Sequence, residues 1–106
     1  MRSIRDPGNG QPIAVAIGET IDVVLSEHAT SGYRWRLISH DEQLVHLESE
    51  AYESASGAVP GAPGSHILRL TALRPGRTMI RMASARAGQP AAAGRTLALP
   101  LLIAPG

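Results

Sequence analysis

Residues 28–35 read His-Ala-Thr-Ser-Gly-Tyr-Arg-Trp, and this stretch passes from a turn into a strand. Its first five residues are small or polar, and Thr, Ser and Gly are common in tight connections. From residue 33 to residue 37, apolar side chains alternate with arginine, which is the pattern of a strand that buries one face. The stretch predicts a loop followed directly by a strand, with Tyr33 and Trp35 as core residues rather than contact residues.

The same alternation recurs on both sides of this stretch and indicates five further strands, over residues 13–17, 20–25, 66–73, 78–84 and 97–103. Residues 44–52 begin with a denser apolar stretch whose pattern does not separate a strand from an irregular segment, and they are interpreted as a sixth further strand. Gly18-Glu19 and Arg74-Pro75-Gly76-Arg77 predict turns between strands. No segment has a convincing helical spacing. Pro100 lacks an N–H donor, so the last strand is expected to run along a sheet edge there or to bulge. About seven short strands predict an all-β fold, an immunoglobulin-like β-sandwich with Greek-key connections.

Length and composition favour a single domain. The chain has 106 residues, of which 43% are apolar and 18% charged, so one core can form without disulfides or a metal. We expect a flexible N-terminal segment over residues 1–12 and one β-sandwich domain over residues 13–106. The absence of cysteine excludes a thiol nucleophile, a disulfide and a thiolate metal site.

Three long connections are the expected places for function. They are the segments 26–32, 54–65 and 85–94, which contain many small residues and turn formers. In a Greek-key sandwich these connections can lie at one end, where they would form a single binding edge.

A catalytic site finds little support in the sequence. The four histidines lack the spacing of metal ligands and are assigned to the surface or to packing: His28, His40, His46 and His66. The acids Asp41, Glu42, Glu48, Glu50 and Glu53 are interpreted as a solvated face. Ser31 lacks the strand-turn-helix context of a nucleophile elbow, and the glycines near residue 61 do not open a helix that would bind phosphate. We therefore expect no enzyme, no metal site and no cofactor.

The charge of the chain bears on its partners. The formal net charge is +1 and the arginines are spread along the sequence, which disfavours nucleic acid and a membrane surface as partners. No apolar run approaches the length of a membrane helix. We expect a monomer, periplasmic or secreted if a signal peptide has been removed and cytoplasmic otherwise.

The first loop and the predicted strand order resemble the chagasin-like inhibitors of papain-family cysteine peptidases. That family's first loop has the pattern Asn-Pro-Thr-Thr-Gly-Tyr/Phe; Thr30, Gly32 and Tyr33 are identical to it, and Ser31 keeps the hydroxyl of the second Thr. Trp35 and the two predicted turns also agree. The resemblance covers about residues 13–103. It implies an immunoglobulin-like sandwich that presents three loops, 28–33, 57–65 and 85–94, as a wedge into the cleft of a papain-like peptidase.

The other two loops agree less with the family. Gly61-Ala62-Pro63-Gly64 meets the second-loop pattern Gly-x-Gly-Gly at its first and last positions, and Arg86 alone keeps the third-loop pattern Arg-Pro-Trp/Phe. The resemblance implies a reversible, non-covalent inhibitor whose peptidase-binding residues are His28, Ala29, Thr30, Ser31, Gly32, Gly61, Ala62, Pro63, Gly64 and Arg86.

The departures from the family predict weakened or retargeted inhibition. His28 and Ala29 stand where the family has an Asn and a Pro that stiffen the loop. Gly88 stands where it has an aromatic residue, the type that forms interface hot spots worth about 2 kcal/mol or more. The alternative is a non-inhibitory binding or assembly module that has kept the fold and lost the third inhibitory loop. An exposed last strand over residues 97–103 would favour that alternative through β-edge pairing.

Overall fold

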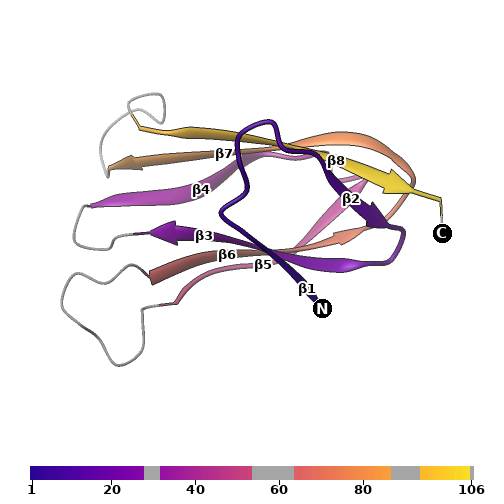
Figure 1. Cartoon of the computed structure of the whole chain (residues 1–106), viewed down its shortest axis with the longest axis horizontal. Helices are drawn as coiled ribbons and strands as arrows, with labels where there is room; N and C mark the ends of the chain where they lie inside the picture. Colours follow the sequence, from indigo (N-terminus) through magenta and orange to yellow (C-terminus); the bar gives the residue numbers. More distant parts are fainter. Residues whose placement is uncertain (28–31, 54–63, 87–93, 106) are drawn as a thin grey trace.

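The computed structural model describes residues 1–27, 32–53, 64–86 and 94–105, which form two packed four-stranded sheets (Figure 1). The first sheet has the spatial order β1 (Arg2–Arg5), β3 (Thr20–Glu27), β6 (Gly64–Ala72) and β5 (Val45–Glu53). The second sheet has the order β2 (Ile13–Ala16), β8 (Thr96–Ala104), β7 (Gly76–Arg86) and β4 (Tyr33–Ser39). The all-β sandwich is therefore confirmed, and β2 to β8 correspond to the seven predicted strands.

The order of strands gives the Greek-key character of the sandwich. β5 and β6 pair antiparallel within the first sheet, and β7 and β8 pair antiparallel within the second. The connections from β3 to β4, from β4 to β5 and from β6 to β7 each pass from one sheet to the other. In the described part of the chain no helix could cross a membrane.

The core lies between the sheets, as the alternation predicts. Inward-facing residues of both sheets are buried, and Trp35 is only 7% exposed. The core cluster consists of Ile13, Val15, Ile21, Val23, Leu25, Trp35, Val45, Leu68, Leu70, Ala72, Ile80, Met82, Leu97, Leu99, Leu101 and Ile103. The expected core position of Trp35 is confirmed.

Strand β1 corrects the expectation of a flexible segment over residues 1–12. It pairs parallel to β3, from Arg2 opposite Ile21 to Arg5 opposite Val24. Only Ile4 of this strand is even partly buried, so the sequence contains no alternation that would have indicated it. The chain then crosses to β2 in the second sheet, which pairs parallel to β8.

The expectation that the last strand runs along an edge at Pro100 is confirmed at that residue. β8 as a whole lies between β2 and β7. Pro100 lies opposite Met79 of β7, but pairing with β2 begins one residue later at Leu101. The proline is thus accommodated where no residue of β2 pairs with it, which removes the cost of its missing N–H. β-edge pairing along residues 97–103 is nevertheless blocked, because β2 pairs with residues 101–104 and Ala98 hydrogen-bonds with Asn9 and Gly10.

Candidate functional site

Six strand ends gather at one end of the sandwich, which we call the loop end: Glu27, Tyr33, Glu53, Gly64, Arg86 and Thr96 (Figure 1). The register places them there, because Glu27 lies opposite Gly64, Glu53 opposite Ser65, and Tyr33 opposite Arg86. Each of the three connections predicted to carry function joins two of these strand ends. The sequence therefore predicted correctly where these connections attach.

The structure places three of the ten predicted binding residues. Gly32 immediately precedes β4 and has a φ of 80°, a conformation that favours glycine. Gly64 and Arg86 belong to the ends of β6 and β7 rather than to loops, which corrects their expected setting. The other seven lie outside the described residues: His28, Ala29, Thr30, Ser31, Gly61, Ala62 and Pro63.

Gly64 occupies a close approach between β5 and β6. A Cβ atom at this position would overlap the hydroxyl of Tyr52 and the carbonyl oxygen of Glu53. The residue is therefore required at the start of β6 for packing, whatever its role in binding. Because Gly64 has no side chain, the ends of β5 and β6, which the second loop joins, can approach each other closely.

Arg86 and Tyr33 join the stems of the first and third loops. The guanidinium carbon of Arg86 lies 4.9 Å from the centroid of the Tyr33 ring. Such a cation–π contact is worth about 0.5–1 kcal/mol at an exposed site. Tyr33 is only half-buried, so its expected position in the core is wrong: its ring packs under Arg86 at the loop end.

Trp35 ties the two ends of the first loop together. Its backbone N–H donates to Oε1 of Glu27 at 2.5 Å, and its indole Nε1 donates to the carbonyl oxygen of Ser26 at 3.2 Å. The last two residues of β3 are thereby joined to the third residue of β4. Glu27 is 3% exposed, and its Oε2 has no hydrogen-bond partner among the described residues.

The buried histidine His66 links the Glu27–Trp35 contact to β5. Nε2 of His66 lies 2.7 Å from Oε2 of Glu50, and Nδ1 lies 3.9 Å from Oε1 of Glu27. Glu50 reaches His66 because the register of β5 shifts between Leu47 and Ser49, which changes the face that later residues occupy. Glu50 is exposed, as expected for the acids of this strand, but its carboxylate contacts His66 and also accepts the N–H of Leu37 at 3.3 Å.

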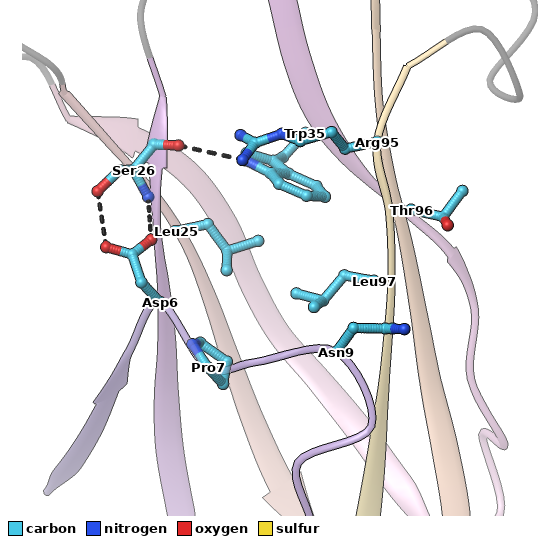
Figure 2. A pocket seen from close by; sticks show the side chains of 9 residues that line it. All are labelled: Asp6, Pro7, Asn9, Leu25, Ser26, Trp35, Arg95, Thr96 and Leu97. Atoms are coloured by element: carbon cyan, nitrogen blue, oxygen red, sulfur yellow. Dashed lines mark hydrogen bonds between the residues drawn. The ribbon is translucent and has the colours of Figure 1, made fainter.

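A pocket of about 410 Å³ opens beside the loop end, between the N-terminal segment, β3 and β8 (Figure 2). Arg95 covers the Trp35 ring, its guanidinium carbon 5.1 Å from the ring centroid. On the opposite wall the Asp6 carboxylate accepts the backbone N–H of Ser26 at 2.8 Å and its hydroxyl at 2.7 Å. The polar groups of the pocket thus brace the stems of the first and third loops.

At the loop end, the described side chains hold the strand ends together. Among the described residues, no three His, Asp or Glu side chains are placed to hold a metal ion. Sequence reasoning missed the anchoring roles of Glu27, Glu50 and Arg95, whereas the burial of His66 agrees with its assignment to packing. The sequence feature that could have indicated the role of Glu27 is its position directly before the first loop. The frame holds three connections side by side, which suits binding rather than catalysis.

Comparison with solved structures supports the fold. The cysteine protease inhibitor EhICP2 from Entamoeba histolytica superposes with a TM-score of 0.78 at 16% identity, covering 97% of this chain and 95% of that one. The solution structure of amebosin gives 0.77 at 23% identity, covering 97% of each chain. PbICP-C, solved in complex with falcipain-2, gives 0.76 at 14% identity, covering 98% of this chain and all of that one.

Comparison of the sequence with known families gives the assignment. No curated protein sequence matches the chain significantly. The family model "Chagasin family peptidase inhibitor I42" matches residues 14–99, which is most of the chain. That family consists of peptidase inhibitors rather than enzymes, in agreement with the expectation that this chain is not an enzyme. The chain belongs to the chagasin family of peptidase inhibitors.

Proposed function

We propose that this protein is a reversible, non-covalent inhibitor of papain-like cysteine peptidases, and that loops 28–33, 57–65 and 85–94 enter the active-site cleft. The observation that carries the proposal is the position of the six strand ends, which attach all three connections to one end of a chagasin-family sandwich. EhICP2, which shares the fold, is a cysteine protease inhibitor, and PbICP-C was solved with falcipain-2.

The proposed mechanism is steric. Thr30 and Ser31 lie nearest the catalytic thiol of the peptidase and offer hydroxyl and backbone groups, but no scissile bond in a productive geometry. Gly61 to Gly64 and Arg86 contact the two flanks of the cleft. No covalent step and no cofactor is needed, so the inhibitor is released unchanged.

The frame beneath the loops favours this mechanism. The Glu27–Trp35 hydrogen bond and the Arg86–Tyr33 contact fix the stems of the first and third loops before a partner arrives. A stem that is already ordered loses less conformational entropy on binding, and the affinity rises accordingly. This offsets part of the affinity lost with the aromatic residue that the family has at the position of Gly88.

Steady-state inhibition tests the proposal. Papain and a cathepsin-L-like enzyme are titrated with the protein up to tens of micromolar, and hydrolysis of a fluorogenic peptide is followed. We expect saturable, reversible inhibition that Ser31→Trp abolishes, because the indole would obstruct entry into the cleft. Gln43→Trp places the same side chain in the exposed β4–β5 connection at the opposite end, and should inhibit like the parent.

Either of two results would reject the proposal in favour of the non-inhibitory module. One is a folded protein, by its β-type circular dichroism, that inhibits neither enzyme at these concentrations. The other is inhibition that Ser31→Trp and Gln43→Trp weaken equally.

A further inference from the structure

The two sheets differ in charge. β2, β4, β7 and β8 of the second sheet contain no Asp or Glu. The strands of the first sheet contain five acids: Asp22, Glu27, Glu48, Glu50 and Glu53. Five of the ten arginines belong to the strands of the second sheet: Arg34, Arg36, Arg77, Arg81 and Arg86.

Four of these arginines lie on the outer face of the second sheet. Side chains alternate along a strand, and Trp35 of β4 and Ile80 of β7 face the core. The residues one position away from these point outward. The arginines at such outward positions are all exposed: Arg34, Arg36, Arg77 and Arg81. We call this surface the basic face. It runs along the outside of the sandwich, from Arg34 beside the loop end to Arg77 near the first residue of β7.

Within the described part of the chain, three arginines of the basic face have no ion-pair or hydrogen-bond partner. Arg34 lies over the Tyr52 ring, 5.6 Å from its centroid. No described residue forms an ion pair or a hydrogen bond with the side chain of Arg36, Arg77 or Arg81. On the first sheet, by contrast, Arg69 binds Asp22 through two nitrogens at 2.9 and 3.1 Å. The unpaired guanidinium groups are thus available for carboxylates, which they bind in a bidentate manner.

Apolar side chains, both small and large, lie between the arginines. One open depression, of about 470 Å³, has Arg81 at its rim and is lined also by Ile38, Ala83 and Ala98. A second, of about 330 Å³, has Arg77 at its rim and is lined also by Ala14, Leu102 and Ala104. Both depressions would accept an apolar side chain next to a carboxylate.

We propose that the basic face binds an acidic polypeptide segment whose carboxylates are separated by apolar side chains. Arg77 and Arg81 are four residues apart on β7, or about 13 Å, which matches two acids four residues apart on an extended chain. The segment belongs to a protein other than the inhibited peptidase, since the loop end stays accessible.

The composition of the face argues against single-stranded nucleic acid. β2, β7 and β8 contain no aromatic residue, and Tyr33 and Trp35 lie on the opposite side of β4. Binding to single-stranded nucleic acid relies on a series of aromatic side chains for stacking, whereas Tyr52, beneath Arg34, is the one aromatic contact of a basic-face arginine among the described residues. The exposed large apolar side chains on the face are Ile38 and Leu102, one at each depression.

Fluorescence anisotropy with a labelled peptide tests the inference. The probe is three repeats of Glu-Ser-Leu-Ser, which puts Glu and Leu alternately on one face of an extended chain. We expect binding that Arg36→Glu/Arg81→Glu weakens about tenfold or more, because two attractive pairs become repulsive. The matched control, Arg5→Glu/Arg74→Glu, makes the same change in net charge at exposed positions outside this face and should weaken binding less than about twofold.

The inference is overturned if the probe does not bind, or if both double variants lose affinity equally, since binding would then depend on net charge alone. It is also overturned if phosphatidylglycerol vesicles or duplex DNA bind more tightly than the peptide with the same dependence on Arg36 and Arg81. The assay uses no peptidase, so its result is independent of the proposed inhibition.

Discussion

The carboxylate of Glu27 is buried one residue before the first loop and accepts the backbone N–H of Trp35. A buried N–H that loses its acceptor costs about 1–3 kcal/mol, more than an exposed ion pair contributes. The histidine beside it, His66, also depends on this carboxylate and on Glu50 for its polar contacts. At the scale of single residues, these buried groups determine how firmly the first loop is attached.

Replacing Glu27 tests this role. Glu27→Ala leaves the Trp35 N–H without an acceptor, and we expect the free energy of unfolding to fall by about 2 kcal/mol in urea titrations. Glu27→Gln keeps an oxygen acceptor and should lose clearly less. Equal losses for the two variants would show that the charge, and not the hydrogen bond to Trp35, is what stabilises the site.

The sequence could not predict these residues, for physical reasons. Glu27 ends an alternating strand, and nothing local distinguishes it from a solvated acid. Glu50 turns toward His66 only because of the register shift in β5, and a bulge of this kind depends on the partner strand rather than on a local pattern. Trp35, whose type and spacing both indicate burial, was predicted correctly.

At the scale of elements, the alternating strands were predictable and the first strand was not. Most of the strands from β2 to β8 bury one face and therefore carry the period of two in their own residues, whereas β5 buries only Val45 and part of Leu47. β1 is held by tertiary contacts: it pairs with β3 along its length, and further hydrogen bonds follow directly after its last residue. The backbone N–H of Asp6 donates to the carbonyl oxygen of Val24 at 2.8 Å, and the Asp6 carboxylate accepts two hydrogen bonds from Ser26.

The Asp6 carboxylate gives this attachment a dependence on pH. Burial raises the pKa of Asp6, but hydrogen bonds from Ser26 and the charges of Arg5 and Arg95 outweigh it, and the net pKa lies below its ordinary value of 3.8. A carboxyl group whose pKa is lower in the folded state than in the unfolded state stabilises the fold at pH values above its unfolded pKa. This stabilisation is lost as the pH falls through the folded value.

Asp6→Asn tests this dependence. We expect the variant to be less stable than the parent by about 1 kcal/mol near neutral pH, a modest value because the carboxylate is largely exposed. The difference should shrink as the pH falls below the ordinary pKa of 3.8 and through the lower pKa of the folded state, where the parent's carboxyl group becomes protonated. Urea unfolding at a series of pH values measures it. A difference that stays constant down to the acid limit would contradict the assigned role of Asp6.

At the scale of the whole molecule, the fold separates its surfaces. The strand ends collect three connections at the loop end, and the second sheet collects unpaired arginines on its outer face. The sequence predicted the first of these, because strand order fixes which connections are neighbours. It could not predict the second, because arginines far apart in the chain meet only through the pairing of β4 with β7.

The central claim, that the loop end covers the active-site cleft, is tested most directly by the reactivity of the catalytic thiol. Papain is incubated with increasing amounts of the protein, and the rate at which iodoacetamide alkylates the catalytic cysteine is measured by mass spectrometry. We predict that the rate falls with the bound fraction and approaches zero at saturation, and that Ser31→Trp gives no protection. An unchanged alkylation rate at concentrations that inhibit hydrolysis would contradict the account.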